Sequence, residues 1–514
     1  MDEISIIEEF CTAEEKNIIT SLLLRLLQCN RSCKIYSTEN IDFINDVFLK
    51  NSVKNISLYD EKKSIDNQLI FLVRNDCNKG DINRIVEEYR DNNTIIVLND
   101  TYVDGPVYKF TNADSAKSIS LYGPFFNITK KSIPDTFKIL AIIHLFNEAD
   151  VIKQTVEYLI SQGVDVFLID NWSSDNSYAL IEELLKTYPR RVFFRRFPEN
   201  APSNFYDWYH QLELTEQISK ETDYSWYIHY DADEYRIAPW ADTTLREAIF
   251  YIDSLGFNVI ENTVIDFKIT EINDSSIFMK DTWFDFGHRS AHFEQTKTWK
   301  KCENVDLKNS GGHIARVSNP KVFPLKILNR HYPFRSYEHA KRKIFMDRKP
   351  RFEVESKERG WHGHYNKVLS AEDIVEKKEG LQLWESDTFH SLYLALFTGI
   401  GIEIEGEKEK LNIESLHLED RESVILYGAG GKGKILYSCL AGRYQIEAWV
   451  DKAYEFIQPM YGRFIESVEI VSKSNSRIVI AIENEKIVTD VIKCLKEMGV
   501  VDRRIIWKKE LFEK

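Results

Sequence analysis

The sequence contains few cysteines, and they lack the spacing that would give them a structural role. The seven cysteines are odd in number and scattered over 514 residues, and no two of them form a CxxC pair. A disulfide framework or a cysteine zinc site depends on paired or closely spaced cysteines. We therefore expect neither, and the pattern favours a cytoplasmic protein with reduced thiols.

Long apolar runs and an excess of basic charge are also missing. No stretch approaches the ~18 apolar residues that a membrane-spanning helix needs, and the opening MDEISIIEEF has neither the basic nor the apolar segment of a signal peptide. The net charge of −14 disfavours binding to nucleic acid. We expect a soluble protein, at most peripheral to a membrane, that meets any anionic ligand with a local basic patch.

The sequence does contain alternating strand-like and helix-like segments, which predict an α/β fold. Its 43% hydrophobic and 29% charged residues are typical of globular proteins, and its length indicates about three domains. Residues 1–135 are expected to form an α/β domain without recognisable chemistry, and residues 136–335 the catalytic domain. A helical extension of residues 336–415 and a Rossmann-like domain of residues 421–514 complete the expected organisation.

The second domain opens with a repeated strand–helix rhythm, which predicts a doubly wound sheet. Sheets of this kind bind ligands at the carboxyl ends of their strands. Its first four strands are expected at residues 138–146, 164–170, 191–197 and 224–234.

Polar side chains gather where three of these strands end. They are His144, Asn147 and Glu148 at the first strand, Asp170 and Asn171 at the second, and Asp231, Asp233 and Glu234 at the fourth. Turns and helix caps favour the same residue types, so each group has a local structural explanation. Three groups at one sheet edge favour a ligand site.

The last group contains a DxD pattern. Two carboxylates separated by one residue on a turning chain, as in Asp231 and Asp233, can bind one hard cation such as Mg²⁺ or Mn²⁺. A cation of this kind holds the diphosphate of a nucleotide sugar and neutralises charge on the leaving group. The alternative is that both residues cap a following helix.

Residues 138 to about 335 resemble a family-2-type glycosyltransferase with the GT-A fold. The motifs IIHLFNEADVI, LIDNWSSDNS and HYDADEYR carry this resemblance in the family's order and spacing, the last as a DADE form of the DxD motif. The resemblance implies transfer of a sugar from a nucleoside diphosphate donor, expected to be UDP-linked, to a glycan or lipid-linked acceptor. It also implies an inverting reaction and a setting in surface polysaccharide assembly.

The resemblance also implies roles for individual residues. Asp170 or Asn171 would meet the uracil or ribose of the donor, and Asp231 and Asp233 would meet ribose, diphosphate and metal. The family often has a second Asp where Asn171 stands, and this departure bears on the identity of the base. The other residues expected to line the nucleotide site, partly through their backbone, are His144, Asn147 and Glu148.

Transferases of this fold commonly take a further metal ligand from a His that follows the DxD. We favour His331, which follows the apolar run VFPLKIL and precedes the helix start SYEHAKRK, and we therefore expect it on a loop. His313, His362 and His364 are the alternatives. A lone His is also commonly a structural hydrogen-bonding residue.

An inverting transferase needs a carboxylate base near the acceptor hydroxyl. The family places this base downstream of the DxD, but no clear xED triplet is present. The candidates are Asp266, Asp285 and Glu294. Aromatic residues between 260 and 300 suit either a sugar ring or a core.

Residues 321–351 contain ten Lys or Arg against two acids, an asymmetry that stands out in an acidic chain. Arg335, Lys341 or Arg342 could neutralise the donor diphosphate or an anionic acceptor. A helix facing anionic lipid headgroups and a simple solvated helix face are the alternatives.

The C-terminal segment SVILYGAGGKGKILYSCL carries Gly428, Gly430 and Gly433 in the GxGxxG spacing between a predicted strand and helix. Asp451 ends the next predicted strand, as in dinucleotide-binding folds. NAD or another nucleotide is therefore a candidate ligand, and a structural or homo-oligomer-forming role is the alternative. A nucleotide-binding oxidoreductase or sensor, or a non-catalytic scaffold, would be the corresponding alternative functions.

Overall fold

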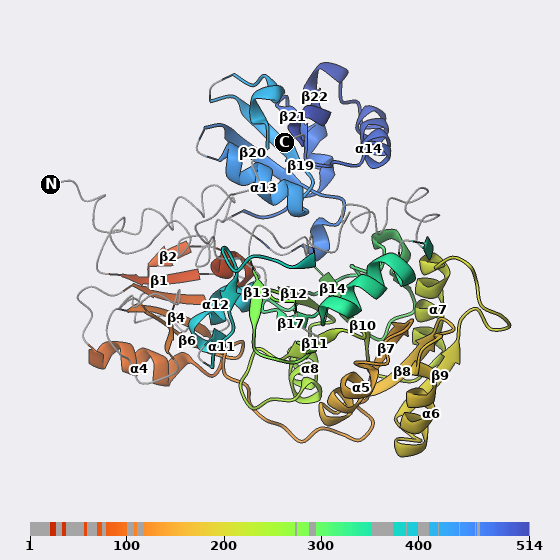
Figure 1. Ribbon diagram of the computed structural model, residues 1–514. Helices are drawn as coiled ribbons and strands as arrows, with labels where there is room; N and C mark the ends of the chain where they lie inside the picture. The colour runs from red at the N-terminus through yellow and green to blue at the C-terminus, as the bar shows by residue number, and fades with distance from the viewer. Residues whose placement is uncertain are drawn as a thin grey trace. The chain divides into compact units, whose positions relative to one another are not determined.

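The computed structural model of the protein forms two compact units, one of residues 128–286 and 294–386 and one of residues 1–127, 287–293 and 387–514. Figure 1 shows their helices and strands. The residues that the structure describes are 21–26, 33–37, 56–58, 69–73, 79–99, 107–109, 118–272, 275–286, 295–348, 350–351, 374–386, 388–398, 411–419, 421–441, 443–457, 459 and 463–512.

The first of these units contains a ten-stranded sheet whose first half is the predicted doubly wound sheet (Figure 1). All seven residues of β7 are buried, as expected for a strand covered on both faces. The sheet pairs β10, β7, β8 and β9 side by side in parallel, so their carboxyl ends meet at one edge. The strands are β7 Ile139–Leu145, β8 Asp165–Asp170, β9 Val192–Arg196 and β10 Trp226–Asp231, and the helices between them are α5 Ile152–Ser161, α6 Ser177–Thr187 and α7 Trp208–Glu221.

The second half of this sheet continues from β10 in the order β14, β12, β17 and β11, with β13 beside β12 and β18 beside β13. Because β14 is antiparallel to both β10 and β12, and β17 is parallel to β12, the ends of β12 and β17 lie at the same edge as the end of β10. The elements are β11 Glu234–Ile237, α8 Leu245–Ser254, β12 Val259–Phe267, β13 Trp283–Asp285, β14 Gln295–Lys300, β15 Val305–Asp306, η1 Lys308–Ser310, β16 Arg316–Val317, β17 Ile327–His331, α9 Tyr337–Lys341, the π-helical η2 Arg342–Arg348, and β18 Gln382–Leu383.

The N-terminal part of the other unit contains a six-stranded sheet in the order β2-β1-β3-β4-β6-β5. The alternation of strands and helices in this domain predicts parallel strands. β2, β1, β3 and β4 are parallel, whereas β6 runs antiparallel to β4 and β5. The connection from β5 to β6 is short, and a parallel pair would need a longer crossover. The elements are β1 Cys33–Ser37, β2 Ile56–Leu58, β3 Leu69–Val73, α4 Lys79–Tyr89, β4 Thr94–Asn99, β5 Val107–Lys109 and β6 Ser118–Tyr122; the helix predicted at 40–51 lies outside the described residues.

The C-terminal part of that unit contains a parallel four-stranded sheet in the order β20-β19-β21-β22. This is a doubly wound order in which the first strand lies between the second and the third. Its main elements are β19 Ser423–Tyr427, α13 Gly431–Leu440, β20 Gln445–Val450, β21 Arg477–Ile480, α14 Glu485–Glu497 and β22 Ile505–Ile506. The short helices are α11 Thr388–Ser391, α12 Tyr393–Thr398, η5 Ile413–Leu416, η6 Tyr454–Phe456, η7 Val468–Ser472, η8 Asp502–Arg504 and η9 Lys509–Leu511.

The predicted α/β fold class is confirmed. Within the described parts of the chain, no helix is both long and apolar enough to cross a membrane.

Candidate functional site

Strand pairing brings three of the predicted site residues to one edge of the ten-stranded sheet. Asp231 ends β10, and the DxD turn leads directly into β11. His331 lies opposite Glu234 of β11 on one side and beside Asp266 of β12 on the other. The turn, Asp266 and His331 therefore meet although they are far apart in the sequence.

Asp233 is the most strongly engaged carboxylate of this group. Its Oδ2 accepts hydrogen bonds from Lys343 Nζ at 2.7 Å and from Arg335 Nη1 at 3.4 Å. Its Oδ1 lies 3.6 Å from His331 Nε2. Burial alone would raise the pKa of Asp233, but the charges of Lys343, His331 and Arg335 outweigh burial and hold the pKa well below its usual range. Asp233 is therefore an anion already matched by cations of the same unit.

Asp231 has a cation of its own. Its Oδ2 accepts a hydrogen bond from Lys297 Nζ of β14 at 2.6 Å, while its side chain remains 35% exposed. Desolvation acts to raise the pKa of Asp231, and the charge of Lys297 overcomes it, so the pKa lies well below its usual range. Asp231 thus presents a charged, partly accessible carboxylate at the strand end.

Glu234 contacts both the DxD turn and Lys297. It is buried, accepts a hydrogen bond from Arg236 Nη2 at 2.7 Å, and lies 3.3 Å from Lys297 Nζ. Its Oε2 also accepts from the backbone N–H of Asp231 at 3.4 Å. Glu234 therefore orients the DxD turn and its lysine through hydrogen bonds.

His331 is the last residue of β17, so the expectation that it lies on a loop is wrong. The strand extends this far because His331 pairs with a neighbouring strand on each side. Its Nδ1 lies 2.7 Å from Asp266 Oδ1, and burial, which lowers the pKa of His331, is outweighed by Asp266 and Asp233, which raise it. A His whose Nδ1–H is held by a carboxylate directs Nε2 outward, as metal-binding histidines do. The role of His331 as a metal ligand stays a prediction that this geometry fits.

Two of the three candidate bases, Asp266 and Asp285, lie on neighbouring strands of the sheet. Asp266 and Asp285 are paired positions of β12 and β13, and both are buried. Lys268 Nζ lies 3.7 Å from Asp266 Oδ2, and burial, which would lower the pKa of Lys268, is overcome by the charges of Asp266 and Asp285. Asp266 is thus hydrogen-bonded to His331, and a role of Asp266 or Asp285 as the base stays a prediction. Glu294 lies outside the described residues.

The end of β8 brings Asp170 and Asn171 to the same edge, both buried. Asp170 Oδ1 accepts from the backbone N–H of Ser173 at 3.0 Å, and Oδ2, which lies 3.6 Å from Arg196 Nε, has no hydrogen-bond partner among the described residues. Such an atom can accept a hydrogen bond from a ligand hydroxyl or base.

Asn171 has a local reason to depart from the family's Asp. Its Nδ2 donates to the carbonyl of Phe197 at 2.7 Å, and its Oδ1 accepts from Arg351 Nη2 at 2.5 Å. A carboxylate at this position would set an oxygen against the Phe197 carbonyl. The amide therefore fits this loop, and contact of Asn171 with the donor stays a prediction.

Asn147 joins the first two strand ends to each other. It adopts a positive φ of 58°, its Oδ1 accepts from the backbone N–H of Ser174 at 2.8 Å, and its Nδ2 donates to Asp347 at 3.0 Å. The side chain thus ties the loop after β7 to the loop after β8 and to η2.

The His144 side chain does not join the other predicted residues at the strand ends. It is buried against α7, where Nε2 lies 2.6 Å from Thr215 Oγ1 and Nδ1 lies 3.2 Å from Gln211 Oε1. Burial, followed by the neighbouring His229, lowers the pKa of His144 to about 3. Strand alternation turns this ring toward the helix, and the expectation that His144 lines the nucleotide site, partly through its backbone, stays a prediction.

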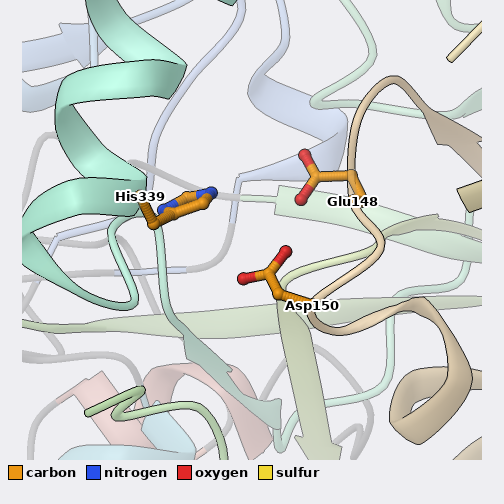
Figure 2. A group of neighbouring side chains, drawn as sticks. All are labelled: Glu148, Asp150 and His339. Atoms are coloured by element: carbon orange, nitrogen blue, oxygen red, sulfur yellow. The ribbon is translucent and has the colours of Figure 1, made fainter. Parts of the chain in front are cut away.

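Three further ligand-type residues lie next to Asp233. Figure 2 shows Glu148, Asp150 and His339 facing one another, and their ligand atoms all lie within 4.8 Å of each other. The fully buried guanidinium of Arg335 is bonded to all three: Nη2 lies 2.5 Å from Glu148 Oε2, 3.0 Å from Asp150 Oδ1 and 2.5 Å from His339 Nε2. This group could hold a metal ion only if Arg335 moved away.

Arg335 contacts the carboxylates of Glu148, Asp150 and Asp233. The hypothesis that Arg335, Lys341 or Arg342 neutralises a donor diphosphate or an anionic acceptor stays a prediction. The sequence interpretation also missed Asp150 and His339, although the motifs NEAD and SYEHAK contain them. Their pairing could not be read from the sequence because it joins the loop after β7 to α9.

Several basic side chains of residues 321–351 form ion pairs with buried acids. Lys343 contacts Asp233 at 2.7 Å, and Arg348 contacts Glu148 at 3.2 Å. Lys341, which the sequence interpretation favoured over Lys343, is half-exposed and pairs with Glu338 at 3.2 Å. In the described part of this segment, Lys343 and Arg348 of η2 therefore act as counter-ions of the acidic strand ends.

The C-terminal fingerprint has the backbone geometry that its glycines predict. Gly428 has a positive φ of 103°, and a Cβ at Gly433 would lie 2.1 Å from the carbonyl oxygen of Gly428. Asp451 accepts hydrogen bonds from the backbone N–H groups of Ala429 and Ala453, both at 2.8 Å. Close packing of α13 on β19 thus explains Gly433, and the positive φ explains Gly428. Asp451 stabilises the loop, and nucleotide binding here stays a prediction.

A protein-family model matches the first part of the ten-stranded sheet. Residues 140–204, which contain β7, β8 and β9, match the family model described as Glycosyl transferase family 2. This match confirms the family resemblance that the motifs predicted. Among curated proteins, none matches the chain.

Solved glycosyltransferase structures are similar to the chain at low identity. S. aureus TarS is 13% identical with a TM-score of 0.25, over 46% of this chain and 50% of TarS. TarS 1-349 in complex with UDP is 14% identical with a TM-score of 0.23, over 40% of this chain and 64% of that one. The mannosyltransferase PcManGT from Pyrobaculum calidifontis, in complex with GDP-Man and Mn²⁺, is 16% identical with a TM-score of 0.19, over 29% of this chain and 41% of that one. The chain spans about half the length of the TarS chain that it matches.

Proposed function

We propose that the protein is a metal-dependent glycosyltransferase that moves a sugar from a nucleoside diphosphate donor, expected to be a UDP-sugar, to a glycan or lipid-linked acceptor. The observation that supports this proposal is the meeting of Asp231, Asp233 and His331 at the carboxyl edge of a sheet whose first strands match glycosyl transferase family 2. Surface polysaccharide assembly, at the cytoplasmic face of a membrane, is the setting that we propose for this reaction.

The donor atoms at this edge suit a divalent cation. Mn²⁺ or Mg²⁺ can be coordinated by carboxylate oxygens of Asp231 and Asp233 together with the imidazole Nε2 of His331. Bound there, the cation would neutralise the charge that develops on the departing diphosphate. Asp170, with one buried oxygen lacking a hydrogen-bond partner among the described residues, is the residue that we assign to the ribose or base of the donor.

The contacts of Asp266 narrow the choice of the base that deprotonates the acceptor hydroxyl. Asp266 is hydrogen-bonded to His331 at 2.7 Å and paired with Lys268, so we assign it to orienting His331. Asp285, beside it on β13, and Glu294 remain the candidates for general base in an inverting transfer.

A panel of nucleotide sugars tests the proposal, with Mn²⁺-dependent release of the nucleoside diphosphate as the readout. We expect turnover of one donor by the wild type, and loss of that turnover in Asp233→Asn. Asp223→Asn is the matched control, because Asp223 is fully exposed on the same unit and pairs only with a surface lysine in the contacts recorded for it. Absence of turnover with every donor, in protein that binds none of them, would contradict the proposal.

The C-terminal fingerprint supports a second candidate function, binding of NAD or another nucleotide by the β19–α13 loop. A Cβ at Gly430 would meet no atom within 4 Å, so this side of the loop is open. Thermal stabilisation by NAD that is reduced in Gly430→Val would support this candidate. A lack of any response to nucleotides would leave the domain a structural or oligomer-forming role.

A further inference from the structure

Asp233 is surrounded by cations that a bound metal ion would have to replace. Lys343 Nζ lies 2.7 Å from Oδ2, Arg335 Nη1 lies 3.4 Å from the same oxygen, and His331 Nε2 lies 3.6 Å from Oδ1. The Asp233 carboxylate is 9% exposed, so little water reaches it. A divalent cation that binds Asp233 must therefore compete with at least one of these groups.

The arginine and lysine side chains that contact the acids of the DxD motif differ in how firmly they are held. Arg335 is fixed by two hydrogen bonds to Asp150 and one to Glu148, at 2.5 to 3.0 Å. Lys297, on the central strand β14, bridges Asp231 and Glu234. Lys343 is different, because among the described residues its only carboxylate partner is Asp233 and its second acceptor is the carbonyl oxygen of Pro333 at 3.0 Å.

Lys343 is also placed to move. It lies on the π-helical element η2, a geometry that often marks functional segments. Its ammonium sits on a flexible four-carbon stem.

We propose that Lys343 is an exchangeable counter-ion of the DxD motif: its ammonium occupies the cation position at Asp233 in the empty site and yields that position when a divalent cation and a donor diphosphate bind. The inference rests on the proposed function, and it adds a residue that the DxD motif does not contain. The displaced ammonium then lies next to the diphosphate and supplies positive charge to it.

Removing an exchangeable counter-ion and removing a purely structural lysine should have different effects on Mn²⁺ binding. Removing the Lys343 charge removes a competitor for Asp233, so Mn²⁺ should bind more tightly in the absence of nucleotide. The same change removes a charge from the diphosphate site, so UDP should improve Mn²⁺ binding less than it does in the wild type. A lysine that only braces the fold would weaken Mn²⁺ binding or leave it unchanged.

The test uses the full chain and the electron paramagnetic resonance signal of free Mn²⁺, titrated without and with UDP. Lys343→Met is compared with Lys301→Met, a change of the same residue type in the same unit, where Lys301 is exposed and paired with Asp223. We expect Lys343→Met to bind Mn²⁺ on the order of tenfold more tightly without nucleotide, the worth of one charge-assisted hydrogen bond. Lys301→Met should match the wild type in both titrations.

The outcomes separate this inference from the proposed function. Suppose that the wild type binds Mn²⁺ with UDP, but that the folded Lys343→Met protein binds Mn²⁺ no more tightly than the wild type without nucleotide. Counter-ion exchange is then overturned, and the transferase proposal stands. If the wild type shows no saturable Mn²⁺ binding even with UDP, the metal-dependent function fails and the inference fails with it. Should Lys343→Met not fold, Lys343→Gln replaces it, because the amide can still donate to Asp233 without carrying charge.

Discussion

Replacing Arg335 by alanine is the sharpest test of how the acidic strand ends are held together. The Arg335 guanidinium is fully buried and contacts Glu148, Asp150 and Asp233 at distances from 2.5 to 3.4 Å. Its removal leaves these carboxylates close together, with a cavity where the guanidinium was. The variant therefore loses the shared counter-ion of three acids.

The expected cost is large. Removing one partner of a buried ion pair typically lowers the free energy of unfolding by about 3–5 kcal/mol. For a unit of this size, each kcal/mol lowers Tm by roughly 2–4 °C, so Tm should fall by roughly 6–20 °C.

The variant should also gain a response to metal. Without Arg335, the ligand atoms of Glu148, Asp150 and His339 still lie within 4.8 Å of one another, and a divalent cation can enter between them. Mn²⁺ at 100 times its dissociation constant would return about 2.7 kcal/mol of stability.

Urea unfolding of the wild type and Arg335→Ala, with and without Mn²⁺, measures both effects. The stabilisation of the variant by Mn²⁺ must exceed that of the wild type, which controls for a cation at the DxD motif. Arg342→Ala is the matched control: Arg342 is 38% exposed, and among the described residues it pairs with Asp347 and donates to the carbonyl of Asn147, so its loss should cost less than that of the buried Arg335. An Arg335→Ala protein as stable as Arg342→Ala, or one that Mn²⁺ stabilises no more than the wild type, would refute this reasoning.

Three further predictions concern stability. Gly433→Ala should destabilise the C-terminal sheet by about 1–3 kcal/mol, because the new Cβ would lie 2.1 Å from a backbone oxygen, whereas Gly430→Ala, facing open space, should cost less in the same urea titration. Lys326→Met should lower the free energy of unfolding by about 3–5 kcal/mol, because it leaves Glu261, 2.6 Å away and buried, without that lysine; the double variant Lys326→Met, Glu261→Leu should recover most of the loss. Burial lowers the pKa of His144 from 6.5 to about 3, so below pH 6.5 the unfolded chain binds a proton that the folded chain does not. The free energy of unfolding should therefore fall by about 1.4 kcal/mol per pH unit from this residue as the pH drops from 6.5 toward 4, and unfolding at pH 7 and pH 5 should show a smaller difference in His144→Gln than in the wild type.

The residues within each strand and turn were sufficient to predict the part of the site that is local in sequence. The buried apolar run before Asp231, and the helix-period segments between the first strands, specify a doubly wound sheet. Such a sheet places its carboxyl ends at one edge whatever the rest of the chain does. The DxD turn and Asp170 follow directly from that rule.

Pattern alone could not give the direction of individual side chains. His144 was expected at the nucleotide site because it ends a strand, but alternation along β7 turns its ring toward Gln211 and Thr215 of α7. His331 was assigned to a loop, yet pairing on both sides extends β17 to include it. In both cases the neighbouring strands and helices decide the outcome.

The sequence by itself determined the fold class, the order of the first strands and the acidic motif at their ends, because each depends on the spacing of residues a few positions apart. The tertiary structure alone decided which cation meets which acid. Lys343 lies 110 residues from Asp233, and Arg335 lies 187 residues from Glu148. Ten basic residues in one segment offered many possible pairings, and only the packing of α9 and η2 against the strand ends selects these. Such pairs form where backbone elements bring charges together in a site of low dielectric, and local sequence carries no record of that position.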